Sequence, residues 1–154
     1  MATLQEIYDV ETACESGVAA ILTDKGLTAV SALDATNVVT PYVAVRFITG
    51  PAGPHRYIAS SGNVYYDTWE GTLLLTVMSQ RDAGGHRDMV STVRLAMQVG
   101  QANFTSDRFP THSIRNVLET GTAPDVVAKD DIDVTAITFA CIVNVNQDAW
   151  PVDA

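Results

Sequence analysis

Three segments of the chain alternate between two sets of side chains in the way that β-strands do. In the strand that begins at Tyr65, one face carries Leu73, Leu75 and Val77 and the other carries Thr72, Leu74, Thr76 and Met78. The segments from Pro41 to Thr49 and from Ile132 to Asn146 alternate in the same manner. All three are therefore predicted strands, and the last is long and apolar enough to be central in a sheet.

Two other segments have the spacing of amphipathic helices. From Leu4 to Leu22 apolar residues recur at helical intervals, with Thr3 as an N-cap and with Lys25 and Gly26 at the end. A second helix is expected to start at Asp82 or at the glycine pair 84–85 and to lie across the sheet. Its apolar stripe is formed by Met89, Val90, Val93, Ala96 and Met97.

The remaining segments give weaker signals. Gly26 to Ala35 is expected to hold a short strand, and His112 to Glu119 fits either a strand or a helix. The loop from Gly50 to Tyr57 is rich in glycine and proline, so it is predicted to protrude rather than to join a ladder. Gly100 to Pro110 is predicted to be a second polar loop, and Gly121 to Asp131 an acidic connection.

These elements predict a single α+β domain over residues 1–154, with a mostly antiparallel sheet and two helices packed on one of its faces. The other face mixes apolar and polar side chains. It would carry Leu74, Met78 and Ala140 beside Thr72, Thr76, Thr138 and Asn144. A half-apolar face of this kind is expected to be covered by a neighbouring subunit.

Composition narrows the possible functions. With 18 acidic and 9 basic side chains the formal charge is −9, which disfavours binding to nucleic acid phosphates. Cys14 and Cys141 are far apart and are predicted to be free, buried residues, which favours a reducing compartment. No apolar run approaches the roughly 20 residues of a membrane helix, so no membrane contact is expected.

No arrangement of residues in the sequence selects a catalytic, cofactor or metal site. His55, His86 and His112 lack the spacing of zinc ligands, and His86-Arg87-Asp88 matches a kinase motif in three letters only. Asp67 and Glu70 could pair as carboxylates, but a strand edge explains them more simply. Asp130, Asp131 and Asp133 are interpreted as a solvated acidic turn because they lack the glycine and the distal glutamate of a calcium loop.

Large aromatic and arginine side chains are the candidates for an interface. Trp69 and Trp150 are interpreted either as core residues or, for one of them, as an interface hot spot. Only two of the nine cationic residues are lysine, and arginine favours fixed, bidentate salt bridges between subunits. The arginines singled out are Arg46, Arg81, Arg87, Arg108 and Arg115.

Several stretches together resemble the small neck and tail terminator proteins of tailed bacteriophages, over roughly residues 40 to 151. The first is Tyr65-Tyr-Asp-Thr-Trp-Glu-Gly-Thr-Leu-Leu-Leu-Thr-Val, followed by Arg81-Asp82, His86 and the helix from Val90 to Met97. The others are His112-Ser-Ile-Arg-Asn-Val-Leu-Glu-Thr-Gly-Thr, Asp130-Asp-Ile-Asp-Val-Thr and Asp148-Ala-Trp-Pro.

The resemblance implies a non-enzymatic virion protein, assembled in the host cytoplasm, that forms a ring, expected to be a hexamer. The ring would end growth of the tail tube, contact the tube protein and the head connector, and let DNA pass through its acidic lumen without specific binding. Arg81, Arg108 and Arg115 would face acidic residues of neighbouring subunits, and the loops at 50–57 and 100–110 would contact the tube or the connector. The alternatives are a head-completion or stopper connector, a tail tube subunit, or a cytoplasmic domain that binds a small ligand.

Overall fold

The computed structural model describes residues 3–51, 53–58, 65–98, 104–105, 107–123, 126–128, 131–146 and 149. Within these residues the helices are α1 (Leu4–Tyr8), α2 (Val10–Asp24), α3 (His86–Gln98) and two short 3₁₀ helices, η1 (Ala32–Asn37) and η2 (Arg81–Ala83). The strands are β1 (Ala29–Ser31), β2 (Tyr42–Thr49), β3 (His55–Ile58), β4 (Tyr65–Gln80), β5 (His112–Thr122), β6 (Val126–Ala128) and β7 (Ile132–Val145).

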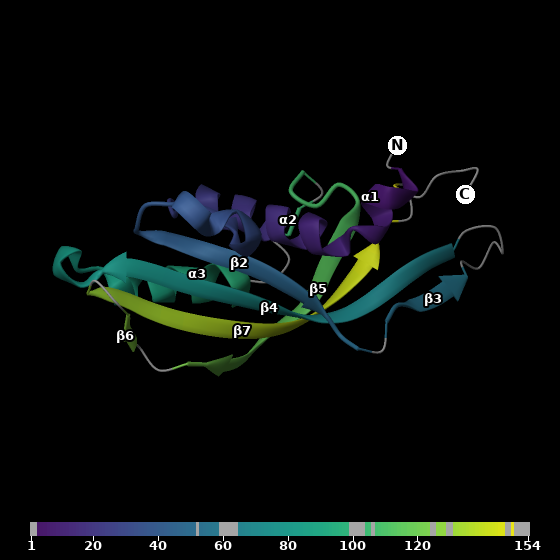
Figure 1. Cartoon of the computed structure of the whole chain (residues 1–154). Helices are drawn as coiled ribbons and strands as arrows, with labels where there is room; N and C mark the ends of the chain where they lie inside the picture. Colours follow the sequence, from purple (N-terminus) through teal and green to yellow (C-terminus); the bar gives the residue numbers. More distant parts are fainter. Residues whose placement is uncertain are drawn as a thin grey trace.

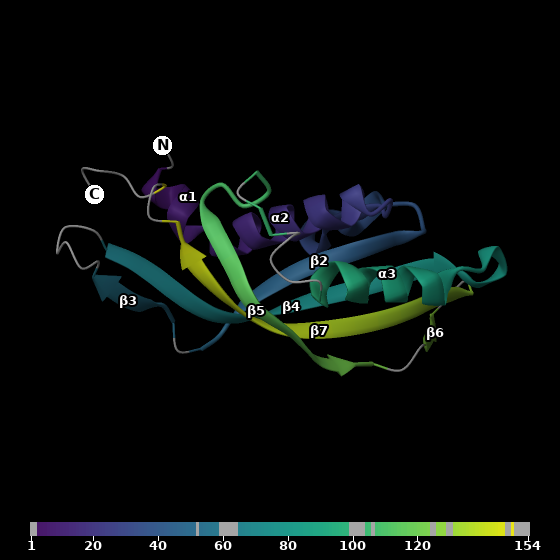
Figure 2. The same ribbon diagram turned by 180° about the vertical axis from the view of Figure 1, so that it is seen from behind.

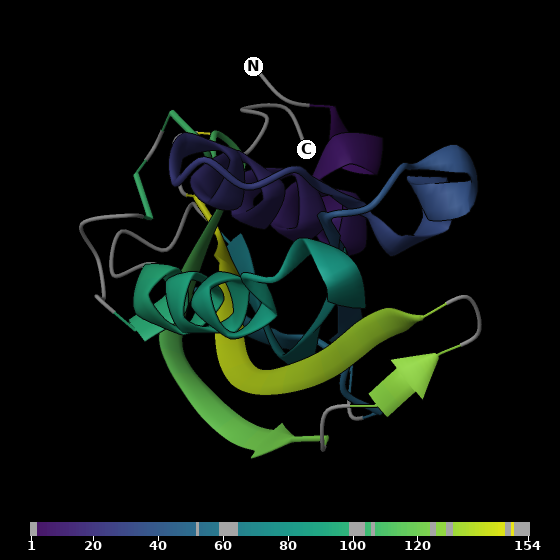
Figure 3. The same ribbon diagram turned by 90° about the vertical axis from the view of Figure 1, so that its left-hand side faces the viewer.

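The described strands form one sheet in which β1, β2, β4, β7 and β5 lie side by side in that order. β1 and β2 are parallel and every other pair is antiparallel, while β3 pairs with β4 and β6 pairs with β7. The helices lie on one side of this sheet (Figure 1), and the sheet curves around α2 and α3 (Figure 3). The predicted α+β fold and the interior position of the last long strand are therefore confirmed.

The core lies between the helices and one face of the long strands. Leu73, Leu75 and Val77 of β4 are fully buried, as are Ile137 and Phe139 of β7, so the face predicted by alternation is correct. The helices close this core with residues that recur at helical spacing. From α2 and α3 these are Cys14, Val18, Ile21, Leu22, Val90, Val93, Ala96 and Met97.

Both cysteines are free and buried, as the sequence predicts. Burial raises the pKa of the Cys14 thiol well above its usual value and raises the pKa of Cys141 to about 12. Both thiols therefore stay protonated at neutral pH and act as small apolar core residues.

The N-terminal segment predicted as one helix is interrupted. Thr3 is the expected N-cap, and it forms a reciprocal capping box with Glu6. Asp9 leaves the helical conformation, with φ −89° and ψ 63°, and its carboxylate accepts a hydrogen bond from the backbone N–H of Thr12 at 3.3 Å. Asp9 therefore ends α1 and begins α2, because an aspartate can satisfy free N–H groups at a helix start.

Two predictions for the connecting segments are wrong. The loop at 50–57 does join a ladder, because β3 pairs with β4 from His55–Thr68 to Ile58–Tyr65. Both prolines, Pro51 and Pro54, precede the paired residues, so each residue of β3 keeps its backbone N–H. The connection at 121–131 likewise holds β6, which pairs with the start of β7. The ambiguous segment from His112 is strand β5.

A buried carboxylate joins α2 to the edge of the sheet. Glu15, which is 5% exposed, accepts a hydrogen bond from the backbone N–H of Phe47 at 2.9 Å and another from the Ser31 hydroxyl at 2.6 Å. β1 pairs with β2 only from Val43 to Val45, so the carboxylate satisfies an N–H of β2 beyond the end of β1. The Glu15 side chain thus replaces the missing strand as hydrogen-bond acceptor for this part of β2.

Replacing Glu15 with alanine is expected to lower the free energy of unfolding by about 1–3 kcal/mol, because Phe47 N–H and the Ser31 hydroxyl both lose their acceptor. Urea denaturation measures this change. The Glu15→Gln variant keeps one acceptor and should lose less. Equal stability of wild type and Glu15→Ala would show that water replaces the carboxylate at no cost.

Candidate interaction surface

The buried histidines have structural rather than catalytic surroundings. His86, the first residue of α3, places Nδ1 2.7 Å from Ser79 Oγ and Nε2 2.8 Å from Thr135 Oγ1. Ser79 and Thr135 are buried, and the second ring nitrogen meets a hydroxyl instead of the carboxylate that would orient a catalytic base. The contacts fix the start of α3 to β4 and β7.

His112 links β5 to the N-terminal helix. Its Nε2 donates to the carbonyl oxygen of Ile7 at 2.8 Å, and Nδ1 lies 2.7 Å from Thr111 Oγ1. Burial lowers the pKa of His112, although the bond to Ile7 and the charge of Asp9 partly oppose this shift. His112 is therefore a neutral residue that anchors α1, and no group of three or more metal-ligating side chains occurs among the described residues.

Stability is expected to fall as pH drops below the ordinary histidine value near 6.5, because His112 takes up a proton in the unfolded state before it does so in the folded state. Each unit by which the pKa of His112 in the folded state lies below its unfolded value adds about 1.4 kcal/mol to the free energy of unfolding. This contribution is fully present above pH 6.5. Urea denaturation of wild type and His112→Gln between about pH 5 and 8 checks this. The glutamine side chain does not titrate, so the variant should show the weaker pH dependence, and identical slopes would contradict the assignment.

The predicted acidic candidates do not come together as a site. Asp67 is buried on the core side of β4, whereas Glu70 is exposed on the opposite side, so they cannot work as a carboxylate pair. Asp133 forms an ion pair with Arg81, and Asp131 is in a turn with φ 58°. Asp130 lies outside the described residues.

Trp69 belongs to the core, which confirms one of its two interpretations. Its ring packs edge-on against Tyr8, with centroids 6.3 Å apart, and lies 6.1 Å from the His112 ring. Only a small part of the indole reaches solvent, so a partner could gain little from contact with it. Trp150 lies outside the described residues.

The arginines predicted to join subunits divide into two groups. Arg81 contacts Asp133 at 3.2 Å, and Arg108 Nε donates to Asp24 at 3.0 Å, so both have acidic partners in their own chain. The side chains of Arg46, Arg87 and Arg115 are exposed and make no hydrogen bond or ion pair with any described residue. Among the described residues, this second group is therefore the one with unbalanced charge to offer a neighbour.

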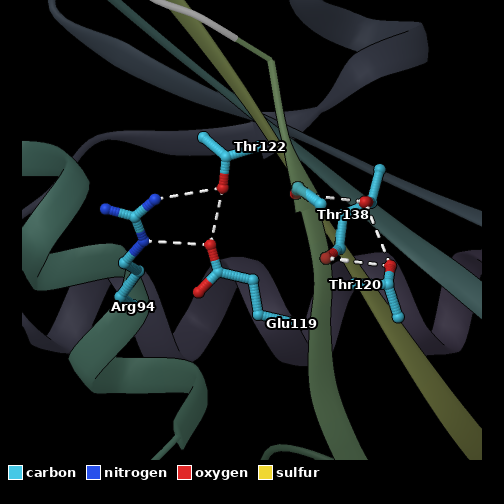
Figure 4. A network of polar contacts seen from close by, with 6 residues as sticks. Arg94, Glu119, Thr120, Thr122 and Thr138 are labelled. Atoms are coloured by element: carbon cyan, nitrogen blue, oxygen red, sulfur yellow. Dashed lines mark hydrogen bonds and ion pairs between the residues drawn. The ribbon is translucent and has the colours of Figure 1, made fainter.

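A polar network that sequence reasoning missed connects α3 to β5 (Figure 4). Arg94 donates from Nε to Glu119 and from Nη2 to Thr122, both at 3.0 Å, and the Thr122 hydroxyl donates to the same carboxylate at 2.6 Å. The hydrogen bond from Thr122, followed by the effect of Arg94, lowers the pKa of Glu119. Nothing in the local sequence marks this contact, because α3 and β5 are well separated along the chain.

The face of the sheet turned away from the helices is uncovered by any described element (Figures 1 and 2). We call it the open face. One row of paired residues crosses four of its strands, from Ile48 through Thr72 and Ala140 to Leu118. The residues at the two ends of this row have large apolar side chains: Ile48 is 46% exposed and Leu118 is 66% exposed. Exposed side chains of this size, aligned across a sheet, are typical of protein contact surfaces.

The open face also contains a shallow hollow of about 430 Å³. It is lined by small or short side chains of β4 and β7, among them Thr72 and Ala140, together with Leu118 and Glu70. Its open shape and mostly apolar lining suit a protruding side chain of a partner protein better than a tightly enclosed small ligand.

Comparisons with known proteins assign no family to the chain. No protein-family model matches it. No curated protein matches it either. In the part of the chain that the structure describes, none of the helices has the length and apolar character needed to cross a membrane.

Proposed function

We propose that the chain is a structural virion protein that assembles into a ring at the neck end of a phage tail, ends growth of the tail tube and joins the tail to the head. The observation that carries this proposal is the open face, where Leu118 and Ile48 expose apolar surface across four paired strands. Neighbouring subunits that cover this face would bury that surface. The location of this ring, at the neck end of the tail, is proposed from the resemblance of the sequence to tail terminators.

The negative net charge of the chain favours a ring through which DNA can pass without binding. Each subunit contributes a formal charge of −9, so a ring of several copies would repel the phosphates of a DNA molecule in its lumen and allow it to slide. Of the three arginines that the resemblance places at subunit contacts, Arg115 is the one without an ion pair to a described residue of its own chain. Its position beside Ile142 on the sheet is compatible with an acidic partner in the next subunit.

Phage particles assembled in the absence of this chain distinguish the terminator role from the connector role. If the chain ends tube growth, such particles should have tails of uncontrolled length without heads. A stopper connector would instead leave tails of normal length beside detached heads. Normal, infectious particles would contradict both roles.

A further inference from the structure

The short helix α1 has one buried residue and a break in the backbone where it meets α2. Of its five residues Ile7 is buried, whereas Leu4 and Tyr8 are nearly half exposed. At Asp9 the backbone leaves the helical conformation, so α1 does not continue into α2. A helix of five residues does not persist alone in water, so α1 keeps its shape only while it is docked. We call residues 3–8 the α1 strap.

The α1 strap lies close to the end of β7 (Figures 1 and 2) and is held there by side chains of the sheet. Ile7 packs in the core, and its carbonyl oxygen accepts a hydrogen bond from His112 Nε2 at 2.8 Å. Tyr8 packs edge-on against Trp69. Opening the strap would break these contacts but not those between the long strands and helices. It should therefore cost less free energy than unfolding the chain.

The imidazole of His112 is fully buried beside the α1 strap. Its nearest described partners are the Ile7 carbonyl, the Thr111 hydroxyl and the ring of Trp69, and none of these groups is charged. A buried imidazolium without a counter-charge in contact is costly. Removal of the strap takes Ile7 away and admits water to the ring. His112 should therefore bind a proton more tightly when the strap is open than when it is closed.

The charge of Asp9 opposes this effect without cancelling it. Burial lowers the pKa of His112, while the bond to the strap carbonyl and the charge of Asp9 act in the other direction. Asp67, on the core side of β4, is buried and has an interaction of its own. The charged residues that flank these contacts in the sequence are at least partly exposed to solvent: Glu6, Glu11 and Arg115.

We propose that α1 is an acid-released strap, which opens at Asp9 when His112 takes up a proton, while the sheet and α2 stay folded. The open state brings Trp69 and the core site of Ile7 into contact with solvent. The strap opens within a single chain, so the proposal does not depend on the ring. Because one bound proton separates the open state from the closed state, the open fraction should rise by up to about tenfold for each pH unit below about 6.5. The rise ends where the closed state also binds the proton.

Hydrogen exchange between about pH 7.5 and 5.5, corrected for the intrinsic pH dependence of exchange, measures this opening. The reporters are the backbone N–H groups of Ile7 and Asp9, which donate to the carbonyl oxygens of Thr3 and Gln5. Their protection should fall by about three- to tenfold over this range. Amides of β7 should stay far more strongly protected at both pH values, because they exchange only when the whole chain unfolds.

Two substitutions should change this response in opposite directions. His112→Gln keeps an N–H donor for the strap carbonyl but cannot titrate, so the protection of the reporters should no longer depend on pH. Asp9→Asn keeps an oxygen that caps α2 but removes the charge that favours protonation in the closed state, so the response should extend to lower pH. His86→Gln is the matched control, since it replaces another buried histidine away from the strap and should respond as wild type does.

Circular dichroism melting curves show whether each variant is folded. The expected outcome is a pH response in wild type that His86→Gln keeps and His112→Gln loses. A response that His112→Gln shares would overturn the proposal, as would wild-type reporters whose protection is independent of pH or no weaker than that of β7. If His112→Gln does not fold, Asp9→Asn decides, because it leaves the core unchanged. A response in Asp9→Asn that ends at the same pH as in wild type would then overturn the proposal.

Discussion

Replacing Leu118 with glutamate is expected to abolish self-assembly without unfolding the subunit. Leu118 is 66% exposed on β5, so a charged side chain fits the isolated chain. In the proposed ring the same position is covered by a neighbour, and burial of an unpaired carboxylate costs several kcal/mol. That cost corresponds to a loss of roughly a hundredfold or more in association. Native mass spectrometry at matched concentrations measures it.

Leu33→Glu provides the control for this experiment. Leu33 is 75% exposed in η1 and is not part of the open-face row, so the substitution makes the same chemical change away from the proposed contact. It should leave assembly as in wild type. If Leu118→Glu assembles as well as Leu33→Glu does, the open face is not where subunits meet.

The second large effect is expected where the loop before β5 packs on α2. Phe109 is buried, and its ring occupies the space in which a side chain at Gly17 would lie, since a Cβ atom there would be 2.1 to 2.5 Å from three ring carbons. Phe109→Ala should lower the free energy of unfolding by about 3–5 kcal/mol. Gly17→Ala should lower it by about 1–3 kcal/mol through overpacking, although alanine is the better helix former.

A double-mutant cycle checks that these two effects share one cause. With Phe109 reduced to alanine, the clash at position 17 disappears and the intrinsic preference of alanine for a helix remains. The double variant should therefore be more stable than the sum of the two single changes predicts, by about 0.5–3 kcal/mol in denaturant titration. Strictly additive changes would show that Gly17 is not needed for the packing of Phe109.

Periodicity is sufficient to predict the long elements of this fold. β2, β4 and β7 alternate so regularly that both faces of the sheet can be assigned, and the stripe of α3 identifies its buried side. The break at Asp9 is not predictable in this way, because an aspartate suits the first turns of a long helix as well as the cap of a new one. β3 escapes prediction because its neighbouring prolines suggest a loop.

The exposed position of Leu118 shows why the candidate surface is only partly predictable. Ile114 and Leu118 have the same parity, so simple alternation places both on one face of β5. Ile114 is buried and Leu118 is exposed, because the register shifts between Arg115 and Leu118, where Asn116 adopts φ 54°. A bulge of this kind moves the following side chains to the other face, and no local signal in the chain marks it.

Pairings between distant charges are also beyond sequence reasoning. Arg81 and Asp133 are 52 positions apart, and Arg108 and Asp24 are 84 apart, so neither ion pair follows from local spacing. The resemblance places both arginines against neighbouring subunits, whereas both have partners within the chain. The half-apolar character of the open face, by contrast, follows directly from the alternation in β4 and β7.

The most direct test of the ring is native mass spectrometry of the wild-type protein over a range of concentrations, combined with negative-stain images of the same samples. We expect a single closed ring of fixed subunit number that dissociates to monomers on dilution, without open-ended tubes. Long tubes would identify a tail tube subunit instead. A protein that stays monomeric at every concentration would contradict the claim that the open face is covered by copies of the same chain.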